Sequence, residues 1–137
     1  MNNLEDWLRH LEGLHPKGQA GIELGLERIR RVKAALGQTQ HCPVIIVGGT
    51  NGKGSTSAML ESILQAGGYR TGLYTSPHLL RYNERIVING AQAADGLLVS
   101  AFEAIDAARG ATTLTFFEFN ALAALWIMGA PFGFMGF

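Results

Sequence analysis

The stretch GTNGKGS, residues 49–55, constrains the fold of this chain more than any other feature. It follows the apolar run PVIIV, residues 43–47, and precedes a stretch in which apolar residues recur at helical spacing. Glycines allow consecutive backbone N–H groups to turn toward one anion, and a lysine adds a mobile ammonium. A strand, a glycine-rich loop and a helix in this order predict a phosphate cradle that binds a nucleoside triphosphate.

The cradle combines glycine amides, one ammonium and hydroxyl groups. The residues expected to bind ATP are Gly49, Thr50, Asn51, Gly52, Lys53, Gly54, Ser55 and Thr56. The spacing departs from GxxxxGK[ST], because Val47 stands where the first glycine would be and Gly54 directly follows the lysine. A plain glycine-rich turn is the alternative. The strand, the loop, the lysine, the hydroxyl groups and the helix are all expected of a phosphate-binding loop, so the sequence favours the cradle.

Composition indicates one globular domain without a nucleic-acid surface. The chain has 137 residues, of which 47% are hydrophobic and 16% charged, and 11 basic residues balance 11 acidic ones. The basic residues of segment 28–33 therefore read as the solvated side of a helix. A single cysteine, Cys42, excludes an intramolecular disulfide, and residues 1–9 lack the pattern of a signal peptide. We expect a soluble cytoplasmic protein.

The end of the chain lacks charge. No charged residue follows Glu118, but Asn120, Pro131 and several glycines make residues 119–137 a poor membrane-spanning helix, so no membrane partner is expected. We interpret residues 117–128 as a buried helix and residues 129–137 as an atypical apolar tail. This tail would expose three phenylalanines, Phe132, Phe134 and Phe137. The domain therefore looks cut short near residue 128.

Apolar periodicity predicts the remaining elements. Helical spacing is found at residues 4–14, 26–36, 59–66 and 98–109, with Asn2 or Asn3 as a cap for the first helix and Gly37 as the end of the second. Residues 70–75 read as a second strand, which completes a βαβ unit with the phosphate loop. Alternation at residues 85–88 before Asn89-Gly90 predicts a hairpin. The pattern is that of an α/β fold.

Four segments carry a family resemblance. IIVGGTNGKGST (45–56) and YTSPHLLRYNERI (74–86), supported by IELGLERI (22–29) and TFFEFNALAALW (115–126), resemble the folylpolyglutamate synthase and dihydrofolate synthase family. The resemblance covers residues 4 to 128. Related muramyl-peptide ligases place a hydroxyl residue directly after the loop lysine, so Gly54 favours the folate branch.

The resemblance implies a fold and an activity. The fold would be a P-loop-type three-layer sandwich with a mostly parallel sheet, here the incomplete N-terminal part (residues 1–128) of a Mur-ligase-like ATPase domain. The activity would be ATP-dependent ligation: a carboxylate of dihydropteroate or a reduced folate is phosphorylated, and the amino group of L-glutamate attacks the acyl phosphate. Mg²⁺ is the implied cofactor, and full-length relatives are expected to be monomers.

The resemblance also assigns roles to residues. Lys53 is the implied catalytic cation, and the hydroxyl of Ser76 is an implied Mg²⁺ ligand, although a simple Ser-Pro turn would explain Ser76 as well. His78 reads as a structural residue. The implied substrate-binding residues are Glu23, Leu24, Gly25, Thr115, Phe116, Phe117 and Glu118. An aromatic side chain would stack on the flat pterin ring, whereas the alternative is that both phenylalanines belong to the core.

Several family features are not found after residue 128. These are an ExGxGG segment with a metal-binding glutamate, a later metal-binding histidine, a modified lysine and the C-terminal domain that binds glutamate. The sequence therefore leaves three interpretations: part of a folate ligase that is inactive alone, a fragment of a muramyl-type amino-acid ligase, or a non-catalytic ATP-binding remnant. An unpaired apolar sheet edge would favour self-association.

Overall fold

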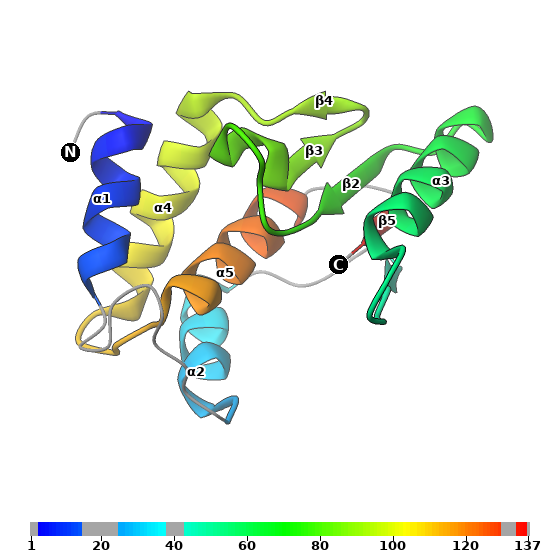
Figure 1. The fold of residues 1–137 in the computed structure, drawn as a ribbon. Coiled ribbons are helices and arrows are strands. Elements are labelled where there is room, and N and C mark those ends of the chain that lie inside the picture. Colours follow the sequence, from blue (N-terminus) through cyan, green and yellow to red (C-terminus); the bar gives the residue numbers. More distant parts are fainter. Residues whose placement is uncertain (1–2, 15–24, 38–42, 130–133, 137) are drawn as a thin grey trace. The chain divides into compact units, whose positions relative to one another are not determined.

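The computed structural model describes residues 3–14, 25–37, 43–129 and 134–136 (Figure 1). The chain forms two compact units: a helical unit, Met1–Thr39 with Asp95–Ile127, and a sheet unit, Gln40–Ala94 with Met128–Phe137. The helices are α1 (Leu4–Leu14), α2 (Glu27–Leu36), α3 (Lys53–Ala66), α4 (Asp95–Arg109) and α5 (Phe116–Met128), with a 3₁₀ turn η1 (Tyr82–Arg85). The strands are β1 (Val44–Ile45), β2 (Thr71–Tyr74), β3 (Ile86–Ile88), β4 (Ala91–Gln92) and β5 (Phe134–Gly136).

Two helix ends in the helical unit, the start of α1 and the end of α2, lie where the sequence predicts them. The side-chain oxygen of Asn3 accepts a 2.8 Å hydrogen bond from the backbone N–H of Asp6, which makes Asn3 the cap of α1. Helix α2 ends at Gly37, whose φ of +69° suits glycine. These two ends confirm the capping and stop signals read from the sequence.

Aromatic contacts connect the core of the helical unit. Both α1 and α2 pack on α4, and Figure 1 shows α1 beside α4. The ring of Phe102 in α4 lies 6.0 Å from that of Trp7 in α1 and 5.9 Å from that of Phe119 in α5. All three side chains are buried. The predicted helical spacing in α1, α4 and α5 is therefore confirmed by the side chains that it buries.

The sheet unit contains a mixed sheet with strand order β1-β5-β2-β3-β4. Strand β5 pairs in parallel with β1 and β2, whereas β2–β3 and β3–β4 are antiparallel pairs. The expectation of a mostly parallel sheet is therefore wrong for the described strands. The short segment between β2 and β3 contains only a 3₁₀ turn, and a parallel pair needs a longer crossover. The three-layer P-loop sandwich stays a prediction.

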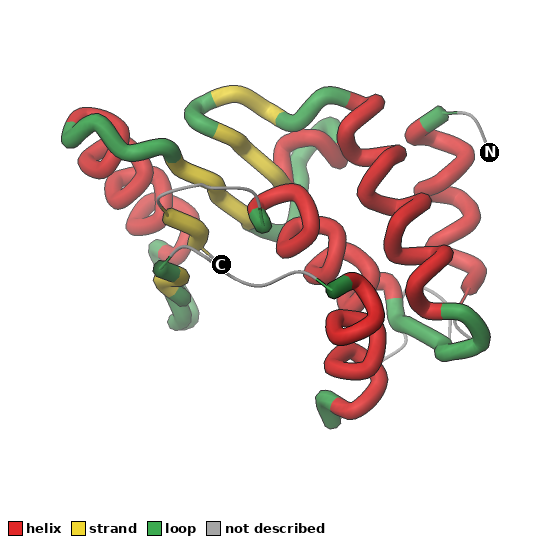
Figure 2. Tube along the Cα trace, turned by 180° about the vertical axis from the view of Figure 1, so that it is seen from behind, coloured by secondary structure: helices red, strands yellow, loops and turns green. Residues whose placement is uncertain are grey.

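The predicted hairpin is confirmed. Strands β3 and β4 are joined by Asn89 and Gly90, whose φ values of +49° and +87° match the turn expected for this dipeptide. Figure 2 shows this hairpin from behind, and α3 lies against β2 within the same unit. Crossover helix α3 therefore connects two strands, β1 and β2, that run in the same direction.

Strand β5 was missed by the sequence analysis. Phe134–Gly136 belongs to the segment interpreted as an apolar tail, but it pairs between β1 and β2. A charge-free segment suits an inner strand, which has neighbours on both sides. Phe132 and Phe137 lie outside the described residues. Among the described helices, none is long and apolar enough to cross a membrane.

The segment between β2 and β3 is anchored by two consecutive residues. The backbone N–H of Thr75 donates a 2.9 Å hydrogen bond to the carbonyl oxygen of Arg85. The carboxylate of Glu84 accepts hydrogen bonds of 2.8–2.9 Å from the N–H groups of Leu79, Leu80 and Arg81. The two leucine side chains are about 90% exposed. Glu84 and Arg85 thus hold the backbone of this loop, and the side chains of Leu79 and Leu80 do not take part in a hydrophobic core.

We expect Gly72→Ala to destabilise the sheet unit. An added Cβ would lie 2.8 Å from Sδ and 2.9 Å from Cγ of the buried Met128, so a side chain would have to move. Overpacking of this kind costs about 1–3 kcal/mol of unfolding free energy, measurable by chemical denaturation.

Gly96→Ala in α4 is the control for that experiment, because its Cβ would meet no atom within 4 Å. In a helix this replacement should be neutral or stabilise by about 0.5–1 kcal/mol. Equal stability of Gly72→Ala and the unaltered chain would contradict the close approach of β2 to Met128.

We expect Glu84→Gln to lower stability in a pH-dependent way. Hydrogen bonds from the backbone N–H groups of Leu79, Arg81 and Leu80 hold the pKa of Glu84 below its ordinary value. A lowered pKa in the folded state stabilises the chain above the unfolded pKa of about 4.3, and this stabilisation disappears as the pH falls through the folded pKa. The stability difference between the variant and the unaltered chain should therefore be largest near neutral pH and shrink in acid.

Denaturation at several pH values between neutral and strongly acidic measures this difference. Glu103→Gln, at an exposed position of α4, is the matched control. A Glu84→Gln difference that stays constant across the acid range would contradict the role of the carboxylate charge.

Candidate functional site

The loop between β1 and α3 has the backbone geometry of an anion-binding turn. Gly49 and Gly52 adopt φ values of +149° and +76°, which side-chain-bearing residues rarely adopt, and α3 begins at Lys53. The whole of segment 49–56 is exposed. The first N–H groups of a helix have no partner within the helix, so this turn offers them to a ligand.

Lys53 lies over the loop that precedes it. Its Nζ donates a hydrogen bond to the backbone carbonyl oxygen of Gly49. The ammonium is therefore held on the same turn as the glycines, and its contact with phosphate stays a prediction. Ser55 and Thr56 are exposed in the first turn of α3, where the N–H of Thr56 bonds to the Gly52 carbonyl at 2.9 Å. Ammonium, amides and hydroxyls come together at one helix end.

The register of the sheet brings Ser76 to the edge from which this loop emerges. Ile45 of β1 and Leu73 of β2 pair with the same residue of β5, Gly136, so the two parallel strands are level there. The loop follows β1 and Ser76 follows β2. Strands two places apart are separated by about 10 Å, so both segments leave the same edge within a ligand's length.

Ser76 has a side chain that can bind a metal ion, but the described residues offer no cluster of further metal-binding side chains. Its side chain is exposed and offers a hard hydroxyl oxygen, of the kind that Mg²⁺ prefers. Within the described residues there is no group of three or more His, Cys, Asp or Glu side chains that could hold a metal ion. A cation at this edge would take the Ser76 hydroxyl together with phosphate oxygens of a nucleotide. The donor set fits such a shared site.

A cation–aromatic cluster supports the loop that contains Ser76. Arg85 is nearly buried; its Nε donates a 2.8 Å hydrogen bond to Nδ1 of His78, and its guanidinium carbon lies 5.4 Å from the ring centre of Tyr82. Burial raises the pKa of both Tyr74 and Tyr82. Both phenols therefore stay neutral, and His78 has a structural partner. The sequence did not identify Arg85 and Tyr82 as interacting residues. The alternating pattern predicts a hairpin, but it does not predict that an arginine lies over a tyrosine ring.

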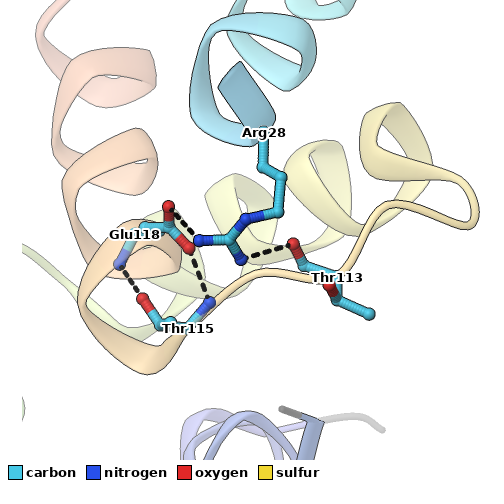
Figure 3. A network of polar contacts seen from close by, with 4 residues as sticks. All are labelled: Arg28, Thr113, Thr115 and Glu118. Carbon is cyan, nitrogen blue, oxygen red and sulfur yellow. Dashed lines mark hydrogen bonds and ion pairs between the residues drawn. The ribbon is translucent and has the colours of Figure 1, made fainter. Parts of the chain in front are cut away.

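The second predicted group lies at the start of α5, in the helical unit. Thr115 Oγ1 accepts a 3.1 Å hydrogen bond from the N–H of Glu118, and Glu118 Oε1 accepts a 2.9 Å bond from the N–H of Thr115 (Figure 3). This reciprocal pair is a capping box. The spacing T-x-x-E is the sequence signal of such a box, whereas the family resemblance implies only substrate binding for both residues.

Arg28 joins this capping box to α2. Its Nη2 lies 3.0 Å from Glu118 Oε2, and its Nη1 donates a 3.2 Å hydrogen bond to the carbonyl oxygen of Thr113 (Figure 3). The Arg28 and Glu118 side chains are 18% and 9% exposed. The expectation that Arg28 belongs to a solvated helix face is therefore wrong. Helical periodicity identifies an apolar face, but it does not show which arginine finds a carboxylate ninety residues away.

The two phenylalanines of this turn differ in exposure. Phe116 is 8% exposed and Phe117 is 62% exposed, so Phe117 alone of the pair presents its ring to solvent. Gly25 is exposed and has a φ of +102° just before α2. Glu23 and Leu24 lie outside the described residues. Four predicted substrate residues therefore lie together at the start of α5: Thr115, Phe116, Phe117 and Glu118.

Comparison with known proteins gives a consistent result. The chain is 48% identical over 125 residues to the dihydrofolate synthase/folylpolyglutamate synthase of Escherichia coli K12, a match that covers 90% of this chain and 29% of that protein. The E. coli FolC structure in complex with DHPP and ADP superposes with a TM-score of 0.91 at 44% identity, covering 98% of this chain and 32% of that one.

A bifunctional folylpolyglutamate synthase/dihydrofolate synthase with Mn, AMPPNP and L-glutamate bound gives a TM-score of 0.90 at 41% identity, covering 99% of this chain and 32% of that one. No family model matches the chain. The chain thus spans about a third or less of the length of these relatives. Over that length, this chain is homologous in sequence and fold to the folylpolyglutamate synthase/dihydrofolate synthase family.

Proposed function

We propose that this chain is the nucleotide-binding part of an ATP-dependent ligase of folate metabolism. The reaction would join L-glutamate to dihydropteroate, to a reduced folate, or to both, through an acyl phosphate. The observation that carries the proposal is the exposed loop 49–56, which has the Lys53 ammonium over it and shares a sheet edge with Ser76. Relatives crystallised with ADP, AMPPNP, DHPP and L-glutamate support it.

The proposed reaction requires a positively charged phosphate-binding loop of this kind. Phosphorylating a carboxylate brings two anions together, and cations with fixed N–H dipoles must offset their repulsion. Lys53 is the catalytic cation in this proposal, and the amides of Gly49, Gly52 and Gly54 contact the phosphates. Ser55 and Thr56 add hydroxyl groups in the first turn of α3. Thr50 and Asn51 complete the loop.

Mg²⁺ is the proposed cofactor, held by the Ser76 hydroxyl and nucleotide oxygens. When bound, such an ion neutralises charge on the phosphoryl group in transfer. A related structure contains Mn, which indicates a divalent metal in the family. The protein's part is to keep the Ser76 segment in place, through the bonds made by Glu84 and Arg85.

The acceptor site is proposed at the segments 23–25 and 115–118 of the helical unit. Phe117 has the exposed ring that could stack on a pterin, whereas Phe116 is buried and supports the turn. Gly25 is exposed just before α2, and no atom lies within 4 Å of the position that its Cβ would take. Glu23 and Leu24 precede it in the sequence. The exposed ring of Phe117 suits a flat aromatic acceptor. Gly54 in the loop favours a folate ligase over a muramyl-type ligase.

We expect the 137-residue chain to bind nucleotide without completing the ligation by itself. The chain spans about a third or less of the length of its relatives, so we propose the complete reaction only for a protein of their full length. A cytoplasmic location follows from the ATP and folate substrates of the proposed reaction. ADP release that depends on glutamate in the isolated chain would contradict this expectation.

Lys53→Ala should weaken binding of Mg·ATP. The variant removes one charge-assisted contact to phosphate, worth about 1.5–3 kcal/mol, which corresponds to roughly 10- to 150-fold in the dissociation constant. Isothermal titration with Mg·ATP measures the effect.

Lys33→Ala is the matched control, because Lys33 is an exposed lysine near the end of α2. It should leave the affinity for Mg·ATP unchanged. Equal affinities of Lys53→Ala and the unaltered chain would count against the phosphate cradle. Nucleotide binding without any binding of dihydropteroate or tetrahydrofolate would favour a non-catalytic remnant.

A further inference from the structure

We propose that Arg28 is a positioning residue of the acceptor site, which fixes the turn 113–118 against the start of α2. The inference rests on the proposed function, since it concerns the two segments assigned to the acceptor. The first segment ends at Gly25, three residues before Arg28, and the second forms the capping box at the start of α5. Arg28 would act through these segments without touching the substrate.

The contacts of Arg28 span a long stretch of sequence. Thr113 and Glu118 lie 85 and 90 residues further along the chain, and each accepts a hydrogen bond from a different nitrogen of the guanidinium (Figure 3). One nitrogen fixes the backbone before α5 and the other fixes a side chain in its first turn. Two bonds from one planar group restrain both the position and the orientation of the turn.

Burial makes this link selective for arginine. The ion pair is largely removed from water, so it is screened less than the exposed pair of Arg9 with Glu5. A lysine at position 28 would keep the charge, but one ammonium on a flexible stem does not reproduce the two-nitrogen fork. The neighbouring Arg30 and Arg31 of the same helix are exposed.

The network also redefines the part played by Glu118. Its Oε1 accepts from the N–H of Thr115 and its Oε2 pairs with Arg28, so both carboxylate oxygens are engaged within the chain. We infer that Glu118 shapes the turn and that Phe117, which projects from it with an exposed ring, contacts the acceptor. Loss of Arg28 would let this turn shift and would move the ring from its place.

The test compares binding of two ligands by the same variants. Arg28→Ala, Arg28→Lys and Glu118→Gln should each bind dihydropteroate about tenfold more weakly, because a charge-assisted bond that orders the turn is lost. Glu118→Gln keeps a side chain able to complete the capping box, so it isolates the ion pair. Affinity for Mg·ATP should stay unchanged, since the phosphate loop belongs to the sheet unit.

Two controls separate positioning from general loss of stability. Arg30→Ala removes an exposed arginine of the same helix and should change neither affinity. Ile105→Val removes one methylene from the buried face of α4 and should lower stability by about 0.5–1.5 kcal/mol without weakening dihydropteroate binding. The double variant Arg28→Ala/Glu118→Gln should lose no more affinity for dihydropteroate than the single variant that binds it more weakly. Both changes break the same Arg28–Glu118 ion pair, so their effects should not add.

The outcomes distinguish this inference from the function on which it rests. If the unaltered chain binds Mg·ATP but not dihydropteroate, the proposed acceptor is wrong and the role of Arg28 is rejected with it. If the unaltered chain binds dihydropteroate and folded Arg28→Ala binds it equally well, only the positioning role is rejected. Should Arg28→Ala not fold, Arg28→Lys and Glu118→Gln decide the question by the same comparison.

Discussion

The backbone N–H groups at the start of a helix need partners, and this chain meets that need differently at two helices. At α5 the side chains of Thr115 and Glu118 satisfy each other's amides in a capping box. At α3 the capping residue is Gly52, which has no side chain, and no side chain caps the helix. One helix start is therefore capped by side chains of the protein, whereas the start of α3 has no side-chain cap, as the proposed anion site requires.

Local patterns predicted most of the fold because local chemistry determines it. Asn3 caps α1, Gly37 ends α2 and Asn89-Gly90 turns the hairpin, and each of these signals depends on neighbours within four residues. The glycine-rich turn before α3 was predicted for the same reason, whereas its binding of phosphate stays a prediction.

Features that depend on distant partners were missed. Phe134–Gly136 reads as a tail because a three-residue strand has no periodicity of its own, and pairing with β1 and β2 alone defines it. Arg28 looks like any arginine of an amphipathic helix until Glu118 is placed beside it. The sheet is mixed because the short β2–β3 connection makes these two strands antiparallel. The family resemblance did not predict this antiparallel pair.

The position of β5 has a consequence for the order of folding. Strands β1 and β2 lie directly before and after α3 in the chain, yet they do not pair with each other. Each is hydrogen-bonded to residues 134–136, which lie about 60 to 90 positions later in the sequence. During synthesis, α3 and the β3–β4 hairpin can form early, but the parallel part of the sheet can form only after residues 134–136 have been made. Until then β1 has no pairing strand among those described, and an unpaired apolar strand is prone to aggregation.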